Sequence, residues 1–357
     1  MKGCFTRLLA ALTLGAALLT LTSPAALAAE KKKFTIAWSI YVGWMPWDYA
    51  ESSGIMKKWA EKYGIEVEIV QINDYVESIN QYTAGQFDGC VMANMDALTI
   101  PAAGGVDSTA LIVGDFSNGN DGVVLKGAKS LADIKGRKVN LVELSVSHYL
   151  LARGLETVGL SERDLRVVNT SDADLVAAFA TADVNAVATW NPLLSEMLAM
   201  PGATKVFDSS QIPGEIIDLM VVNSAVLKDN PAFGKALTGA WYEIMATMSA
   251  DSDAGKAART AMAVASGTDL AGFEAQLATT KMFYKAADAV AFTNSAELKA
   301  TMQKVAEFSF AHGLLGEGAP DAGFIGIETP AGVYGNSGNI KLRFNPSFMQ
   351  QAADGTL

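Results

Sequence analysis

Several residue types that build catalytic or metal sites are scarce in this chain of 357 residues. It has two cysteines and two histidines, and its 27 basic residues are outnumbered by 38 acidic ones, a formal net charge of -11. Only Cys90 lies beyond the first 30 residues, so we expect no internal disulfide there. The acidic balance argues against a nucleic-acid partner and against anionic membrane surfaces.

The scarcity of histidine also limits catalysis. His148 and His312 are far apart in sequence, and no CxxC or HxxxH spacing occurs, so we expect no metal site. Ser145 and Ser147 precede His148 too closely for a hydroxyl to meet the imidazole as a catalytic triad requires. The sequence therefore predicts no catalytic residues and no cofactor.

The amino terminus has the features of an export signal. Lys2 and Arg7 precede an apolar run over residues 8–21, and Ala26-Leu27-Ala28 is a small-x-small cleavage site. We interpret residues 1–28 as a cleaved signal peptide. The run is short for a membrane span, and no later stretch is long and apolar enough to be one. The remaining chain is expected in the periplasm.

Strand and helix patterns alternate along the rest of the chain. Residues 34–40, 67–72, 87–92 and 109–113 favour strands, with helices predicted over 46–63, 75–84 and 97–103. A second series follows, with strands at 138–142, 166–168 and 186–189 and helices at 147–158, 172–180 and 192–200. Residues 213–223 indicate a returning strand, and 231–312 are mainly helical. The class is α/β, with mostly parallel sheets.

Two lobes are predicted from this series. Residues 114–122 are dense in turn formers and are expected to cross from one lobe to the other. Lobe 1 would comprise residues 30–115 and 222–357, and lobe 2 residues 116–221. Ligands of open α/β sheets bind where strands end and helices begin, which favours a cleft between the lobes.

The motifs resemble a known family. They are Gly85-Gln-Phe-Asp88 leading to Asn94, Leu131 to Val139, Ser145 to Leu151, Ala186-Val-Ala-Thr-Trp190-Asn-Pro192, and Val222 to Pro231. Together they are similar to the periplasmic substrate-binding proteins of ABC importers, in the nitrate/sulfonate/taurine branch. The resemblance implies a type II periplasmic-binding-protein fold, a monomer, and delivery of a small solute to permease subunits in the membrane. Residues 38–47 and 115–122 further resemble a sub-branch associated with urea and guanidine.

The turns expected to face the cleft carry no Lys or Arg, whereas they hold seven carboxylates and four of the six tryptophans. This composition favours a small cation, guanidinium first and urea next, because carboxylates can pair with its edge and an indole can cover its face. The candidate ligand-binding residues are Trp44, Asn94, Asp96, Asp121, Glu143, Ser145, Trp190, Asn191 and Asp218. We expect Asp48 and Glu215 to be solvated.

Two alternatives stay open. One is a receptor for a sulfonate, taurine or nitrate anion. The other is an enzyme that resembles the pyrimidine-precursor synthases of thiamin synthesis, which share this fold. Those enzymes use a histidine cluster and a lysine that carries a cofactor, so the export signal and the few histidines speak against that alternative.

Overall fold

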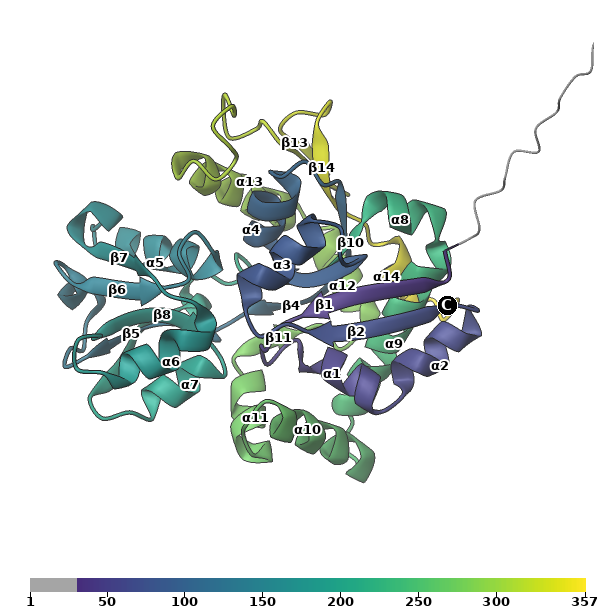
Figure 1. Cartoon of the computed structure of the whole chain (residues 1–357), viewed down its shortest axis with the longest axis horizontal. Coiled ribbons are helices and arrows are strands. Elements are labelled where there is room, and N and C mark those ends of the chain that lie inside the picture. Colours follow the sequence, from purple (N-terminus) through teal and green to yellow (C-terminus); the bar gives the residue numbers. More distant parts are fainter. Residues whose placement is uncertain (1–30) are drawn as a thin grey trace, which may run out of the picture. The chain divides into compact units, whose positions relative to one another are not determined.

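The structure, a computed structural model, describes residues 31–357, and two β-sheets with covering helices organise them (Figure 1). The predicted signal peptide and Cys4 lie outside the described residues. We call the part built on the nine-stranded sheet lobe 1 and the part built on the five-stranded sheet lobe 2.

The sheet of lobe 1 has the strand order β13-β12-β14-β4-β10-β3-β1-β2, and β11 pairs with β4 beyond this path. Its strands are β1 Lys33–Trp38, β2 Glu66–Gln71, β3 Gly89–Ala93, β4 Ser108–Ser117, β10 Ile217–Asn223, β11 Thr280–Met282, β12 Gly326–Thr329, β13 Gly332–Tyr334 and β14 Ile340–Phe344. Strand β10 runs antiparallel to both β3 and β4. The sheet is therefore mixed, and the prediction of a mostly parallel sheet was wrong.

Helices of lobe 1 bury the apolar faces of this sheet. They are α1 Met45–Ser52, α2 Ile55–Lys62, α3 Tyr75–Thr83, α4 Asn94–Ala97, α8 Ser224–Asp229, α9 Pro231–Met248, α10 Asp253–Ala265, α11 Leu270–Leu277, α12 Ala286–Thr293, α13 Ala296–Ala311 and α14 Ser347–Ala353. A π-helical turn, η1 Leu98–Ala102, follows α4. The single helix predicted over 46–63 is two helices, because Gly54 adopts φ +75° at their junction.

Lobe 2 has the strand order β7-β6-β8-β5-β9. Its elements are β5 Asp121–Lys126, η2 Leu131–Ile134, β6 Lys138–Leu141, α5 Val146–Thr157, η3 Glu162–Asp164, β7 Arg166–Asn169, α6 Asp172–Ala180, β8 Ala186–Trp190, α7 Leu193–Leu198, β9 Ala203–Asp208 and η4 Ser209–Gln211. Strand β5 is antiparallel to β8 and β9, so this sheet is also mixed. Neither β5 nor β9 was predicted.

The chain crosses between the lobes after β4 and again before β10. The two crossings are joined where Ser117 Oγ lies 2.6 Å from Ser209 Oγ and where Gly119 N–H donates to the same Ser209 oxygen. The predicted turn at 114–122 is much shorter, since β4 continues to Ser117 and β5 begins at Asp121. The lobe boundaries proposed from the sequence stay predictions, although all of β10 belongs to the large sheet.

Candidate ligand-binding cleft between the lobes

A small cavity lies between the two lobes. It is lined by Tyr41, Trp44, Tyr75, Ala93, Asp121, Val146, Trp190, Ile216 and Asp218. The centre of a water molecule can reach about 20 Å³ of it. Because the centre of a water molecule has so little room to move in it, the cavity suits a solute of only a few heavy atoms.

Four aromatic side chains form the walls. The Trp44 ring lies 5.0 Å from the ring of Tyr41 and 5.5 Å from that of Tyr75, between centroids. Trp190 reaches Tyr75 edge-on at 5.7 Å, and its indole N–H donates to the Ile40 carbonyl oxygen at 3.4 Å. Tyr41, Trp44 and Tyr75 belong to lobe 1 and Trp190 to lobe 2. Both lobes therefore contribute to the aromatic enclosure.

Strand register brings the acidic side chains to this place. Asp218 of β10 pairs with Asp115 of β4 on one side and with Ala93 of β3 on the other. Asp121, the first residue of β5, pairs with Trp190, the last residue of β8. Asp218 and Asp121 therefore enter the cavity from different lobes, and Asp115 stands beside Asp218.

A fourth carboxylate lies behind Tyr75. Asp96 in α4 accepts a hydrogen bond of 2.6 Å from the Tyr75 hydroxyl and another from the backbone N–H of Val146, at the start of α5. Asp96 is fully buried. It thereby connects lobe 1 to the first turn of a lobe 2 helix.

Burial dominates the ionisation of these acids. It raises the pKa of Asp96, Asp115 and Asp121 to about 7 in each case. Burial, together with the negative charge of Asp115, raises the pKa of Asp218 well above its usual range. Among the described residues, no Lys or Arg lines the cavity.

Some polar atoms here have no hydrogen-bond partner. Among the described residues these include Asp96 Oδ1, Asp218 Oδ2 and Trp44 Nε1. Buried polar atoms without partners are costly, typically 1–3 kcal/mol each and more for charged groups. Of these three residues, Asp218 and Trp44 line the cavity, whereas Asp96 lies behind its wall.

The structure places the nine predicted site residues in three groups. Trp44, Asp121, Trp190 and Asp218 line the cavity, and Asp96 lies directly behind its wall. Asn94, Ser145 and Asn191 are buried close by, but protein groups occupy their polar atoms. Glu143 is exposed and does not line the cavity.

The three residues of the second group support the backbone. The Asn94 side chain donates to the Glu215 carbonyl oxygen and accepts from Ile217 N–H. Ser145 caps α5 by accepting from Ser147 N–H at 3.2 Å. Asn191 Oδ1 accepts from the Ser195 backbone in α7. Their role in ligand binding stays a prediction.

Two expectations from the sequence need correction. Glu143 is exposed and does not line the cavity, and it precedes Leu144, which adopts φ +64°. Glu215, expected to be solvated, is buried and accepts from Tyr149, Arg153 and Lys304 at 2.6–2.9 Å. Although burial opposes it, these donors lower the pKa of Glu215 to about 2. Asp48 is half-buried.

Two aromatic residues of the cavity, Tyr41 and Tyr75, were missed from the sequence. Tyr41 donates a 3.1 Å hydrogen bond to Asp115, and Tyr75 donates to Asp96. Gly43 makes the first contact possible, since a Cβ there would come within 2.4 Å of the Tyr41 ring and 2.7 Å of Asp115 Oδ2. The sequence signal that could have indicated Tyr41 is Gly43, which lies between Tyr41 and Trp44 in the loop from β1 to α1.

The fold and the cleft together define the class as an α/β two-lobe protein of the type II periplasmic-binding-protein architecture. The family model described as NMT1/THI5 like matches residues 54–254. The chain belongs to this family. No helix in residues 31–357 is both long enough and apolar enough to span a bilayer.

Relatives of the chain have names that refer to binding. A protein of Brucella abortus (strain 2308), named only as a binding protein, is 26% identical over 175 residues, 48% of this chain and 54% of the relative. The match therefore spans about half the length of that relative. A protein of Escherichia coli (strain K12) named for aliphatic sulfonates is 37% identical over 84 residues, 24% of this chain and 26% of that protein.

Solved structures share the fold at low identity. The alkanesulfonate-binding protein of Xanthomonas axonopodis pv. citri, bound to MOPS, superposes with a TM-score of 0.65 at 19% identity, covering 81% of this chain and 96% of that one. The periplasmic nitrate-binding protein of Synechocystis PCC 6803 gives a TM-score of 0.56 at 12% identity, covering 92% and 99%.

Proposed function

We propose that this protein is the extracytoplasmic solute receptor of an ABC importer and that its ligand is a small nitrogen cation, guanidinium. The receptor role is supported by the family, the two-lobe fold and the buried cavity to which both lobes contribute. In this role the ligand bridges the lobes, stabilises the closed form and is delivered to the membrane permease. The protein works in the periplasm after removal of the predicted signal peptide.

The observation that carries the ligand proposal is the unbalanced charge of the cavity. The cavity is lined by two buried acids, Asp121 and Asp218, and no cationic side chain among the described residues lines it. Two further buried acids stand next to this pair, Asp115 beside Asp218 and Asp96 behind Tyr75. Each unpaired buried carboxylate costs several kcal/mol in its ionised form. A cationic ligand would supply the missing charge and lower the pKa of all four groups.

Guanidinium fits the remaining features. It is planar and small, and it carries N–H donors around its rim that can pair with the two carboxylates lining the cavity, Asp121 and Asp218. Its face can stack on an indole, a contact of about 2 kcal/mol once desolvated. A quaternary ammonium ion would suit the aromatic walls but has no N–H to offer the carboxylates.

Urea is the second candidate ligand because it has a hydrogen-bond acceptor that guanidinium lacks. Trp44 Nε1 is a buried donor without a partner, and urea has a carbonyl oxygen that could accept from it, whereas guanidinium has no acceptor. Urea would also bind acids that stay protonated. It leaves the charge of the cluster uncompensated, however, so we place it after guanidinium.

An anionic solute is the alternative that the relatives favour. Proteins similar to this chain are named for aliphatic sulfonates, alkanesulfonate and nitrate. An anion would need donors or positive charge at the site. The cavity described here offers carboxylates instead, which is why we propose a cation.

Binding rather than catalysis is supported by the place of the histidines. Neither His148 nor His312 lines the cavity, so a histidine cluster of the kind expected for a pyrimidine-precursor synthase is absent from the described part of the cleft. A colourless purified protein would agree with a receptor. A bound pyridoxal cofactor would absorb visibly.

Calorimetry tests the ligand directly. The purified protein is titrated at neutral pH with guanidinium chloride, far below denaturing concentrations, and with urea, taurine and nitrate. We expect guanidinium to bind most tightly and with one ligand per chain. Tight binding of taurine or nitrate would overturn the cation proposal and leave the receptor role standing. Binding of none of the four would overturn the choice of nitrogen cation.

A further inference from the structure

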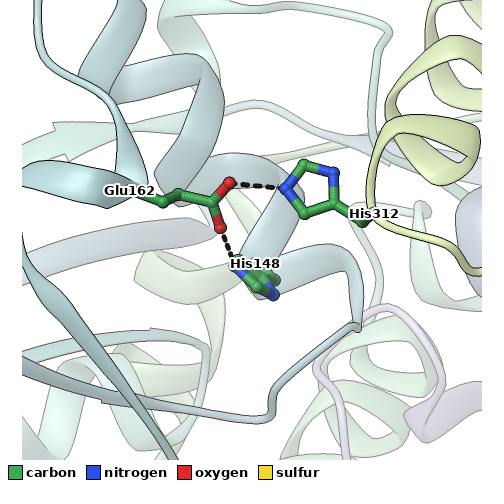
Figure 2. A group of neighbouring side chains, drawn as sticks. All are labelled: His148, Glu162 and His312. Carbon is green, nitrogen blue, oxygen red and sulfur yellow. Dashed lines mark hydrogen bonds and ion pairs between the residues drawn. The ribbon is translucent and has the colours of Figure 1, made fainter.

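The only two histidines of the chain meet at one carboxylate. His148 belongs to α5 in lobe 2, and His312 follows α13 in lobe 1. Between them lies Glu162 of η3, which contacts His148 Nε2 through one oxygen and His312 Nε2 through the other (Figure 2). One potential ligand atom from each residue lies within 4.8 Å of the other two. Their wide separation in sequence, the reason for predicting no metal site, does not keep them apart.

Hydrogen bonds at the far side of each ring fix the protons. His312 Nδ1 lies 2.8 Å from the Phe308 carbonyl oxygen, which can only accept, so Nδ1 carries the proton. In neutral His312 the lone pair of Nε2 then faces a carboxylate oxygen of Glu162. Two acceptors face each other there, and a cation must lie between them. A carbonyl that holds Nδ1–H is also the usual support of a histidine that binds metal through Nε2.

We propose that His148 Nε2, His312 Nε2 and the Glu162 carboxylate bind one divalent transition-metal ion, with Zn²⁺ as the best match. Two imidazoles and one carboxylate form a ligand set that suits Zn²⁺, whereas Ca²⁺ and Mg²⁺ prefer oxygen ligands. Around a tetrahedral zinc ion with bonds of about 2.0–2.2 Å, ligand atoms lie roughly 3.4 Å apart. Each histidine nitrogen would therefore move away from the Glu162 oxygen that it now contacts to make room for the ion.

One hydrogen bond has to change when the metal enters. His148 Nδ1 accepts from Leu144 N–H at 3.1 Å, so in the metal-free protein Nε2 holds the proton and donates it to Glu162. When a metal binds Nε2, the proton of the neutral ring moves to Nδ1, which can then no longer accept from Leu144 N–H. The Leu144 N–H must instead donate to a water molecule. Leu144 is 42% exposed and sits at φ +64°, a conformation that is unfavourable for leucine, so its loop can adjust at moderate cost.

The site is reachable from solvent. Glu162 and His312 line a cavity in which the centre of a water molecule can reach about 460 Å³. The same cavity is lined by four charged residues, Arg153, Glu156, Lys304 and Glu307. Arg153 and Lys304 are paired with Glu215 and do not face the three ligands as free cations. A water from this cavity can take the fourth position on the metal.

The ion would join the lobes away from the ligand cleft. His312 comes from lobe 1, and His148 and Glu162 come from lobe 2, so a bound ion stabilises the arrangement in which the lobes meet. By linkage it would then tighten binding of any solute that requires the same arrangement. Metal binding itself depends only on these three residues and holds whatever the solute is.

Cobalt titration is the test, because tetrahedral Co²⁺ gives visible absorption bands. The full protein, first stripped with a chelator, is titrated with Co²⁺, and Zn²⁺ is then added as competitor. We expect one Co²⁺ per chain, a tetrahedral spectrum, and its loss as Zn²⁺ replaces cobalt. His148→Asn and His312→Asn place an amide near the former Nδ1 and remove Nε2. Losing a group that only supports a metal ligand weakens metal binding by roughly 10–100-fold. Each of these two substitutions removes a ligand itself and should weaken binding by more than that.

The matched control is Glu307→Gln, an exposed acid of the same cavity that is not one of the three ligands. It should bind Co²⁺ as the parent protein does, whereas Glu162→Gln should not. Thermal unfolding of each metal-free variant shows whether it folds. Absence of a tetrahedral spectrum in the folded parent protein, or unchanged binding in folded His312→Asn, would overturn the proposal.

Discussion

The cavity acids show how single residues are placed by strand register. Asp218 meets Asp115 because β10 pairs with β4, and Asp121 meets Trp190 because β5 pairs with β8. A register shift of one residue would turn each side chain to the opposite face of its sheet. The position of the acids is therefore part of the fold, and their charge can be changed without moving the backbone.

Asp218→Asn is the sharpest single substitution in the proposed cation site. Asparagine keeps the shape and removes the charge, so guanidinium affinity should fall by more than about tenfold, since a hydrogen bond to a charged group contributes roughly 1.5–3 kcal/mol. The ligand-free protein should melt at a higher temperature at alkaline pH, because the substitution removes a group that could ionise beside Asp115. Calorimetry and thermal unfolding at slightly alkaline pH measure the two effects.

Glu143→Gln serves as the control for charge removal. Its carboxylate is exposed and outside the cavity, so both affinity and melting temperature should stay close to those of the parent protein. If Asp218→Asn bound guanidinium as well as Glu143→Gln does, Asp218 would not belong to the ligand site.

At the scale of elements, helix starts near the cleft are held by side chains of their own. Ser145 Oγ donates to the Val142 carbonyl oxygen at 2.7 Å and accepts from Ser147 N–H, so it caps α5. The next residue, Val146, lines the cavity and offers its N–H to Asp96. The cap therefore positions a contact between the lobes without contacting the cavity itself.

Ser145→Ala should act on stability more than on binding. Loss of an N-cap costs about 1 kcal/mol, which lowers the melting temperature by a few degrees in a chain of this size. Guanidinium affinity should change less than it does in Asp218→Asn. Ser145→Thr retains the capping hydroxyl and should behave like the parent protein. A loss of affinity in Ser145→Ala without loss of stability would instead make Ser145 a ligand contact.

Strands and helices were predicted well where the apolar residues follow one clear periodicity. They were predicted poorly where the chain turns. Strands β1, β2 and β3 lie close to their predicted positions, because apolar runs and flanking helices mark them. The turn formers at 114–122 concealed the end of β4 and the start of β5, since Gly119 and its neighbours turn the chain within three residues. Antiparallel β10 could not be oriented from its own sequence.

The site was predictable as far as it follows strand ends. Three of the predicted residues, Asp121, Trp190 and Asp218, line the cavity because they lie at strand ends, which face the cleft in this architecture. Their part in ligand binding stays a prediction. Glu143 is exposed and outside the cavity, in a loop whose course no periodic pattern in the sequence indicated. The contact of His148 with His312 joins residues from different lobes, and no local pattern in the sequence encodes it.

At the scale of the whole molecule, the lobes meet through polar contacts on both sides of the cavity. Ser171 of lobe 2 donates to Asp74 of lobe 1 at 2.8 Å. Glu215, in the crossing before β10, accepts from Arg153 of lobe 2 at 2.9 Å and from Lys304 of lobe 1 at 2.9 Å. Between these contacts, the acids are neutral or charged according to pH and ligand. The ionisation of the cavity therefore couples solute binding to the pH of the surroundings.

The sign of this coupling separates a cation from an anion. The acids have a pKa near 4 when unfolded and about 7 or higher in the folded, ligand-free protein, so the folded state binds more protons in this range. Stability contributed by these groups is thus present at low pH and falls as pH rises from about 4 towards 7. A cation favours the ionised carboxylates, so its affinity must increase over the same range and its binding must release protons.

Calorimetry between about pH 5 and pH 8, repeated in buffers of different ionisation enthalpy, measures affinity and proton release together. We expect guanidinium to bind more tightly at each higher pH, with a net release that shrinks above the pKa of the acids. Asp121→Asn removes one of the titrating groups and should reduce the release. An anion would bind more weakly as pH rises and would take up protons, because it requires the carboxyl groups to be neutral. Urea, which carries no charge, should show a much smaller pH dependence than either ion.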